Sequence, residues 1–307
     1  MRSMKSPRLG RSLVEEQDLH MLYLLLEWRA ESASRTAPEG PEQTAERLST
    51  RATSLSIQEL RDQIKQRLEL QVCESISDLT TNAFRLDVKP SSIPNAGRGV
   101  FANGNATPGQ VVALMPGLVY PRSHHRDIPG YPSFGDESML LMCRHDGHVI
   151  DARAWDQFQT NTIREYNAAR RRRDGQHGID TLWFHPDLRK VLSPLALGHF
   201  INHPPEGVPP NVLPAPVDWS GNDVSKVPWS LYQVPGEGSS VAPNDLSVAR
   251  GGTTPDKVVP GLAFVATRPI KHGEELLVNY RLNPGVIGGL PKWYAAVDEE
   301  EDQLRWL

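Results

Sequence analysis

The chain has 307 residues, of which 38% are hydrophobic, and a formal net charge of −4. This composition permits a sizeable core, which excludes disorder throughout the chain, and the slight acidity argues against direct nucleic-acid binding through bulk positive charge. Two cysteines are too few for a disulfide scaffold or a four-cysteine zinc site. The longest apolar run, residues 19–26, is far too short to cross a bilayer, so we expect a soluble protein with no membrane partner.

The first fourteen residues carry four basic side chains, three serines and no acid. An organelle-targeting segment has this composition, and so does a frayed basic terminus, which is the interpretation we favour. The sequence leaves the compartment open between nucleus, cytoplasm and an organelle.

Residues 1–83 are expected to form a helical extension. Two capping-box patterns, each followed by apolar residues at helical spacing, mark helix starts at Ser12 with Glu15 and at Ser56 with Glu59. Residues 31–55 offer almost nothing to bury, which predicts a flexible linker. Because no ligand motif falls in this region, we expect a chain without residues 1–55 to fold and to keep its ligand site.

The main region is expected to span residues 84–283. As far as Tyr120, short β-branched runs alternate with turn clusters of Gly, Pro and Asn, which predicts strands joined by tight turns. Further elements are expected in this order: a helix over 154–173, strands over 262–267 and 276–280, and insertions at about 155–195 and 212–260. The C-terminal segment, 284–307, contains five consecutive acids at 298–302, which predict a solvated face or tail.

Three segments carry candidate chemistry, and the first runs from Ala96 to Ala102. It contains Gly97-Arg98-Gly99 at the entry to a strand, where glycines leave bare backbone that a ligand can approach closely. A dinucleotide or phosphate loop would need a helix next, which the sequence does not offer. Taken alone, the segment is equally typical of a tight hairpin.

The second segment, Gly198 to Pro205, holds His199 and His203 four residues apart. A helical two-histidine zinc motif wants a glutamate after the first histidine, where this chain has Phe200, and two prolines then stop the helix. We therefore expect no metal site. The third segment, Ile270 to Tyr280, is typical of a hairpin turn that enters a strand, and core packing alone explains it equally well.

Read in this order, the three segments resemble the SET-domain protein lysine methyltransferases. The pattern of that family places Gly-x-Gly-Val-Phe-Ala early, then Phe-Ile-Asn-His with a later Pro-Asn, and finally Gly-Glu-Glu-Leu before a tyrosine. The matching residues are Gly97–Ala102, Phe200–His203 with Pro210-Asn211, Gly273–Tyr280, and Val149–Ala152 for a further Ile-Asp-Ala motif. The resemblance covers residues 84–283.

The resemblance implies a β-rich α+β fold, the SET-domain fold of small β-sheets around a pseudoknot, to which the N-terminal helical extension is added. It implies the transfer of a methyl group from S-adenosyl-L-methionine to a lysine of a protein substrate. Tyr280 is the catalytic residue that it implies, with the hydroxyl aimed at the reacting methyl and amine. The cofactor-binding residues that it implies are Gly97, Arg98, Gly99, Phe200, Asn202, His203 and Tyr280.

The chain departs from the family pattern in two places. Pro204 follows His203, where many members have Ser-Cys, and two cysteines cannot build the zinc clusters that flank many histone-directed members. Four C-terminal residues are candidates for the missing wall of the lysine channel or for plain packing: Leu290, Trp293, Tyr294 and Trp306. A catalytically inactive SET-fold binding module is therefore the alternative function. The substrate, the methylation state and the oligomeric state stay open.

Overall fold

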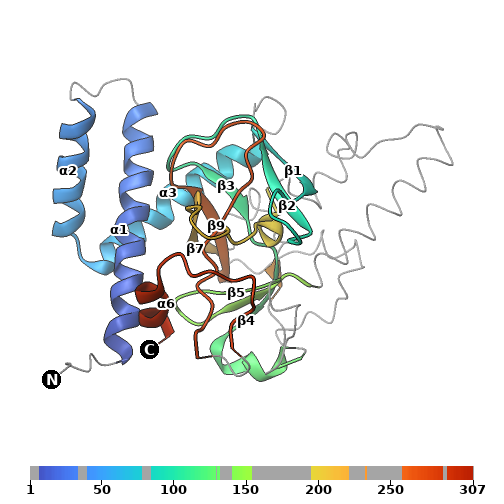
Figure 1. Ribbon diagram of the computed structural model, residues 1–307. Helices are drawn as coiled ribbons and strands as arrows, with labels where there is room; N and C mark the ends of the chain where they lie inside the picture. The colour runs from blue at the N-terminus through green and yellow to red at the C-terminus, as the bar shows by residue number, and fades with distance from the viewer. Residues whose placement is uncertain are drawn as a thin grey trace.

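The computed structural model describes residues 7–33, 40–77, 84–128, 130–131, 140–153, 195–220, 232–233, 258–285 and 289–306. These residues form an α+β fold in which helices stand beside small, mostly antiparallel sheets (Figure 1). The α+β class predicted from the sequence is thus confirmed. The helix expected over 154–173, and most of the two expected insertions, lie outside the described residues.

The N-terminal part contains three helices: α1 (Pro7–Ala33), α2 (Pro41–Ser54) and α3 (Ile57–Ser77). Both predicted helices are present, as α1 and α3, although α1 begins before the predicted cap at Ser12. The capping box before α3 is confirmed. The Ser56 N–H donates to the Glu59 carboxylate at 2.8 Å, and the Glu59 N–H donates back to the Ser56 hydroxyl at 3.3 Å.

Helix α2 shows that the flexible linker predicted over 31–55 is wrong for most of that range. The buried residues of α2 recur every four positions and therefore lie on one face: Thr44, Leu48 and Ala52. The helix packs beside α1 (Figure 1), and Arg47 pairs with Glu31 of α1 at 2.6 Å. The small number of apolar residues in this range predicted a linker, but a helix that packs on another helix needs only a narrow stripe of them.

Helix α1 is part of the hydrophobic core. Leu22 and Leu26 are 0% and 1% exposed and belong to the same buried cluster as residues of the sheets. A Cβ on Gly109, in the turn after β2, would lie 2.1 Å from the Leu25 carbonyl oxygen, so this turn rests directly on the helix backbone. The expectation that the chain folds without residues 1–55 conflicts with this packing, and we expect the opposite result.

The short strands predicted as far as Tyr120 are confirmed by four strands: β1 (Arg85–Pro90), β2 (Arg98–Asn103), β3 (Val111–Leu114) and β4 (Gly117–Tyr120). A 3-10 helix, η1 (Arg122–Asp127), follows them. β1 and β2 pair antiparallel along six residues. β4 belongs to a second sheet, of order β5–β6–β4–β8, whose other members are β5 (Leu141–Cys143), β6 (Val149–Asp151) and β8 (Tyr232–Gln233).

The third sheet has the order β3–β9–β7 and holds the centre of the core. β9 (Val258–Ala266) confirms the strand predicted over 262–267 and pairs along nine residues with β7 (Val212–Ser220). The insertion predicted over 212–260 is thus wrong at both ends. Pro214 and Pro216 suggested a loop, but β7 lies at the edge of its sheet, where a residue without an N–H is tolerated.

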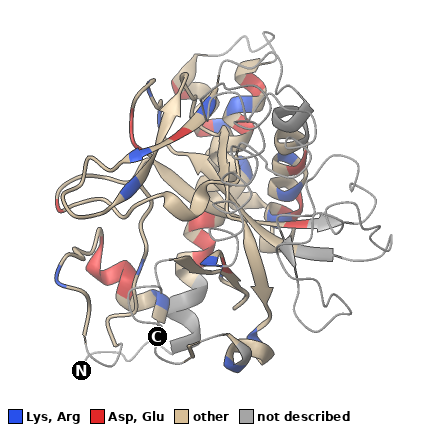
Figure 2. Cartoon of the chain, turned by 90° about the vertical axis from the view of Figure 1, so that its right-hand side faces the viewer, with Lys and Arg blue, Asp and Glu red and all other residues tan. Residues whose placement is uncertain are grey.

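Helix α6 (Glu299–Trp306) contains four of the five acids at 298–302, and three of the five, Asp298, Glu299 and Glu300, are exposed, as predicted for a solvated face. The Asp298 carboxylate accepts the Glu301 N–H at 2.9 Å, and the acids of the first turn complement the positive end of the helix dipole (Figure 2). Asp302 is only 3% exposed and accepts the Tyr294 hydroxyl at 2.6 Å. Because α6 packs against α1, the two ends of the chain lie on one side of the molecule (Figure 1).

Candidate functional site

The third motif segment, Ile270 to Tyr280, lies between the other two. On one side the Leu276 N–H donates to the Val100 carbonyl of β2 at 2.7 Å. On the other side the Val278 N–H donates to the Asn202 carbonyl at 2.9 Å. The strand predicted at the end of this segment is therefore present as isolated bridges to β2, to Asn202 and to Val212 of β7, and not as a member of one of the three sheets.

Asn211, from the Pro-Asn part of the pattern, sets the spacing between the second and third segments. The residue is 0% exposed. Its amide oxygen accepts the Leu277 N–H at 2.7 Å, and its amide nitrogen donates to the Glu275 carbonyl at 2.8 Å. Asn211 thus acts as acceptor for one buried backbone group and as donor to another. Without these bonds both backbone groups would be buried without a partner, which destabilises a fold.

Asn202 joins the first motif segment to the second. Its amide nitrogen donates to the Arg98 carbonyl at 3.0 Å and to the Glu275 carboxylate at 3.1 Å. An amide nitrogen carries two hydrogens, so both are used in these bonds. The amide oxygen is then the atom through which Asn202 can meet a ligand, and a hydrogen-bond donor is the group that it would take.

Glu275 is the site residue that the sequence reasoning missed. It is 6% exposed, and its carboxylate accepts the Ser91 hydroxyl at 2.7 Å and the Ser92 N–H at 2.8 Å, besides Asn202. Burial by itself raises the pKa of Glu275, but these hydrogen bonds outweigh burial and lower the pKa, so the carboxylate is charged at neutral pH. A signal was available: consecutive residues of an extended segment point to opposite sides, so one of the glutamates 274 and 275 had to point inward.

The two glycines of the first segment are required for different structural reasons. A Cβ on Gly99 would lie 2.0 Å from the Glu275 carboxylate, so a larger residue at this position would displace the carboxylate from its present place. Gly97 has a φ of +74°, which favours glycine, and the space where its Cβ would stand is open within 4 Å. The Arg98 guanidinium lies over the Phe200 ring, 4.2 Å from its centre. The structure thus brings the candidate residues of the first two segments side by side.

Tyr280 and His203 hold each other in place. The Tyr280 hydroxyl donates to the Ile201 carbonyl at 2.9 Å, and the Tyr280 N–H donates to Nδ1 of His203 at 3.2 Å. Nε2 of His203 donates to the Ala295 carbonyl at 2.7 Å, so both ring nitrogens are used and neither is left for a metal. Burial raises the pKa of Tyr280 and lowers that of His203, so both side chains are neutral at neutral pH.

Two of the four candidate wall residues lie at this pair. Tyr294 stacks on His203 with 4.4 Å between the ring centres. Trp293 meets Tyr280 edge-on at 6.3 Å and is 50% exposed, so one side of the indole faces the site and the other faces solvent. The arrangement forms an aromatic border on the solvent side of Tyr280.

The other two candidate wall residues, Leu290 and Trp306, are each more than a third exposed. Trp306 lies on α6, where its indole N–H donates to the Arg281 carbonyl at 2.7 Å. This contact does not line the site itself. It joins the C-terminal helix to the residue that follows Tyr280.

His199, on the short 3-10 helix η4 (Gly198–Phe200), makes the stability of the site region depend on pH. It is 5% exposed, and burial, followed by the nearby Arg98 guanidinium, lowers the pKa of His199 from 6.5 to about 3. Between these two values the unfolded chain binds a proton at this position and the folded chain does not. The free energy of unfolding therefore falls as the pH is lowered below about 6.5.

For His199 alone, we expect this fall to amount to about 1.5 kcal/mol between pH 6.5 and pH 5. Every other titratable group is common to the wild type and to a His199 variant, so the difference between the two proteins isolates this contribution. A His199→Gln protein should therefore lose about 1.5 kcal/mol less than the wild type over the same interval. Urea unfolding of both proteins at the two pH values measures the difference, and equal losses would contradict the assignment.

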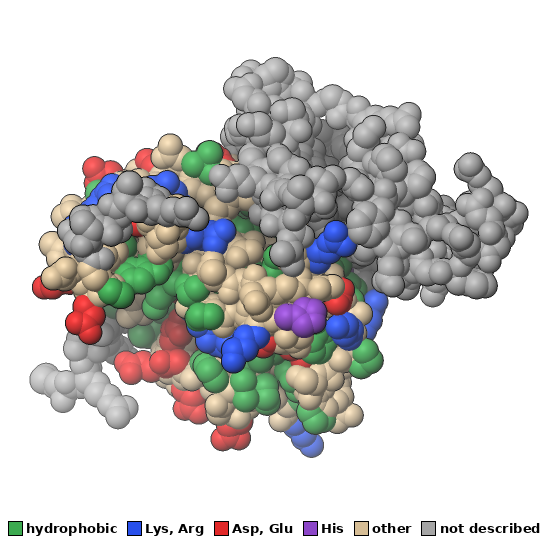
Figure 3. Space-filling model, turned by 90° about the horizontal axis from the view of Figure 1, so that it is seen from above, with side chains coloured by type: hydrophobic (Ala, Val, Ile, Leu, Met, Phe, Trp, Pro, Cys, Tyr) green, Lys and Arg blue, Asp and Glu red, His purple; other side chains and the backbone are tan. Residues whose placement is uncertain are grey.

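Comparison with protein-family models and with curated proteins finds no match for this chain. Within the described residues, no helix combines the length and the hydropathy of a membrane span, and no three His, Cys, Asp or Glu side chains are grouped to hold a metal ion. Basic, acidic and hydrophobic side chains are interspersed over the described part of the face in Figure 3, so that part of the surface has no continuous basic patch.

Proposed function

We propose that the protein transfers the methyl group of S-adenosyl-L-methionine to a lysine side chain of a protein substrate. The observation that carries the proposal is the convergence of three distant segments on one place. Asn202 bonds the carbonyl of Arg98 between the two glycines, and Tyr280 bonds the carbonyl that precedes Asn202. Residues at these positions have the roles of cofactor binding and catalysis in the SET-domain family that the sequence resembles.

The residues at this place suit a cofactor of that chemistry. S-adenosyl-L-methionine carries positive charge on its sulfonium and its ammonium, and the charged Glu275 carboxylate lies beside Asn202. The Asn202 amide oxygen is an acceptor for an ammonium N–H. The open side of Gly97 leaves backbone that a flat or extended ligand can approach. Gly97, Arg98, Gly99, Phe200, Asn202, His203 and Tyr280 are the residues that we propose to hold the cofactor.

When bound, the cofactor supplies an electrophilic methyl group. The protein aligns the two reactants, because a direct displacement requires the attacking nitrogen, the methyl carbon and the leaving sulfur to lie in one line. The Tyr280 hydroxyl donates its hydrogen bond to the Ile201 carbonyl, so the lone pairs of the Tyr280 oxygen are available to the reacting groups. It can accept a hydrogen bond from the amine and weak C–H···O contacts from the methyl. Contact of a lysine amine with the aromatic border would remove water from the amine and so favour its neutral, nucleophilic form.

We also propose that the strands are threaded as in the SET-domain pseudoknot. Support comes from the bridges of the third segment, where Leu277 and Val278 pair in parallel with Asn202 and Val212 while Glu275 pairs with β2 on the other side. A chain that passes between two earlier segments is what such a threaded arrangement requires.

A catalytically silent SET-fold binding module is the second candidate. The Tyr280 hydroxyl makes one hydrogen bond to a backbone carbonyl, and a tyrosine with a purely structural role would make the same bond. Incubation with labelled S-adenosyl-L-methionine and a cell extract distinguishes the two. Labelled protein bands that depend on the enzyme support methyl transfer, whereas cofactor binding without any labelled band supports the module.

Replacement of Asn202 by Ala is expected to weaken cofactor binding. The change removes the acceptor for the cofactor and frees the Glu275 carboxylate from one partner, which should cost about 1–3 kcal/mol of binding free energy. Calorimetric titration of the two proteins measures the change in Kd, which should rise about 5- to 150-fold. Asn105→Ala is the matched control, because the Asn105 side chain bonds the His272 N–H in an exposed turn. If the wild type does not bind at millimolar cofactor, the cofactor assignment is wrong.

A further inference from the structure

Arg281, the residue after Tyr280, has an unusual backbone. Its φ is +48°, a left-handed conformation that residues other than glycine rarely adopt, and the Asn279 side chain accepts its N–H at 3.1 Å. A backbone in such a conformation persists only where the surroundings enforce it. The turn sets the direction in which the chain leaves Tyr280, so whatever enforces the turn also bears on the place of the Tyr280 ring.

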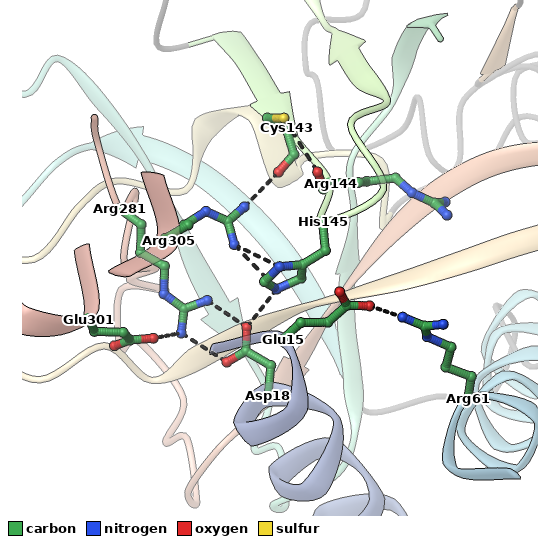
Figure 4. A network of polar contacts seen from close by, with 9 residues as sticks. All are labelled: Glu15, Asp18, Arg61, Cys143, Arg144, His145, Arg281, Glu301 and Arg305. Carbon is green, nitrogen blue, oxygen red and sulfur yellow. Dashed lines mark hydrogen bonds and ion pairs between the residues drawn. The ribbon is translucent and has the colours of Figure 1, made fainter. Parts of the chain in front are cut away.

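The Arg281 side chain is buried in a network of charges that comes from both ends of the chain (Figure 4). Its two terminal nitrogens donate to the Asp18 carboxylate of α1 at 2.6 and 2.9 Å, and one of them also pairs with Glu301 of α6. Arg281 and Asp18 are each 8% exposed. A buried two-point pair of this kind is specific in its geometry, and loss of one partner is strongly destabilising for the other.

A second group, His145, faces Asp18 and helps to fix its direction. Nε2 of His145, from the turn between β5 and β6, bonds the Asp18 carboxylate at 3.0 Å. Arg305 of α6 in turn holds His145, with one guanidinium nitrogen 3.2 Å from both ring nitrogens, and bonds the Cys143 carbonyl at 3.0 Å. Helix α1, the β5–β6 turn and the chain after Tyr280 therefore meet at the Asp18 carboxylate, and α6 holds the partners of that carboxylate (Figure 4).

We propose that Asp18 is a positioning residue for Tyr280, and that α1 thereby belongs to the reaction machinery. The inference rests on the methyl transfer proposed above. Asp18 acts through Arg281: the pair holds the left-handed turn, and the turn keeps the Tyr280 hydroxyl on the Ile201 carbonyl. Loss of the Asp18 charge moves the Tyr280 oxygen and leaves the residues around Asn202 in place.

The test compares Asp18→Asn with Glu15→Gln. Both changes remove one carboxylate of α1 that pairs with an arginine, but Glu15 pairs with Arg61 of α3 and has no link to Tyr280 in the network of Figure 4. Single-turnover methyl transfer at saturating cofactor should fall about tenfold or more in Asp18→Asn, with the Kd for cofactor within about twofold of the wild type. Glu15→Gln should transfer at the wild-type rate.

Rescue separates positioning from a merely structural role. Asp18→Glu keeps the carboxylate and should regain most of the rate, whereas Arg281→Lys keeps the charge but not the two-point geometry and should resemble Asp18→Asn. A wild-type rate in Asp18→Asn would overturn the proposal. So would a rate that falls together with cofactor affinity and with the melting temperature, since that pattern reports a general loss of structure. If Asp18→Asn does not fold, the same outcomes are judged on Arg281→Lys.

Amide hydrogen exchange tests the positioning without any reaction. The Tyr280 and Leu282 amides donate to His203 and to the Tyr294 hydroxyl, so both are protected while the turn holds. In Asp18→Asn these two amides should exchange about tenfold faster, while those of β9 stay unchanged. If the wild type transfers no methyl, the proposed function fails, and this measurement still decides whether Asp18 positions Tyr280. Unchanged exchange at both amides would refute the positioning.

Discussion

A chain that lacks residues 1–55 is expected to be insoluble or to lack fixed tertiary structure. The deletion removes α1 and α2, and with α1 it removes four fully or almost fully buried side chains of the central core: Leu19, Leu22, Tyr23 and Leu26. Each buried leucine alone contributes about 2–5 kcal/mol, and the three together contribute about as much as the whole stability of an ordinary domain. It also removes Asp18 and with it the two-point ion pair of the buried Arg281 guanidinium.

Substitutions at two neighbouring residues of α1 test the same prediction through a measurable change in the free energy of unfolding. Leu22 is 0% exposed and Met21 is 49% exposed. Leu22→Ala should lower the free energy of unfolding by about 2–5 kcal/mol, whereas Met21→Ala should change it by less than about 0.5 kcal/mol. Urea unfolding measures both. The prediction is wrong if the 56–307 chain is soluble and melts cooperatively, or if the two substitutions have equal effects. Either result would show that α1 packs on the surface of the fold and is not part of its core.

A Tyr280→Phe protein is expected to bind the cofactor normally and to transfer methyl groups about 10²-fold more slowly, the scale on which one oriented polar group acts in a transition state. The substitution keeps the ring and its contacts with His203 and Trp293 and removes only the oxygen. The lost bond to the Ile201 carbonyl should cost about 1 kcal/mol of stability, which lowers Tm by about 2–4 °C.

The control for this substitution is Tyr23→Phe. Tyr23 is 1% exposed, and its hydroxyl has no hydrogen-bond partner among the described residues. Removal of that oxygen should leave turnover unchanged and should not lower stability. The measurement is the rate of labelled methyl transfer by both variants, taken beside their Tm and their Kd for the cofactor. Wild-type turnover in Tyr280→Phe would remove the catalytic role of Tyr280 and favour the binding module.

Local patterns were enough to predict the elements whose causes are local. The capping box of Ser56 and Glu59 spans three residues, and β1 and β2 are joined by a short turn. The three motif segments were also readable, since each is contiguous, and the structure brings them together. Elements of this kind depend on interactions that a short window of sequence contains.

Other features depend on partners that no window contains. Asp18 and Arg281 are separated by 263 residues, and nothing near Asp18 distinguishes it from Glu15 one turn earlier. The narrow stripe of α2 has meaning only beside α1. Alternation along the extended segment indicates that one of Glu274 and Glu275 points inward, but which of the two meets the site follows only from Gly99 and Asn202 beside Glu275. Burial of charge is a property of the assembled fold, so the polar core of this protein could not be read from composition or periodicity.

The two prolines of β7 have a consequence for contacts between separate molecules. In this strand the Val212 N–H points away from β9 and donates to the Leu277 carbonyl, so the nitrogens of Pro214 and Pro216, at positions of the same parity, face the same way. A foreign strand that docked along this edge would find no N–H at either position. The two prolines thereby make this side of β7 a poor partner for a further strand, which is one way in which an edge strand is guarded against aggregation.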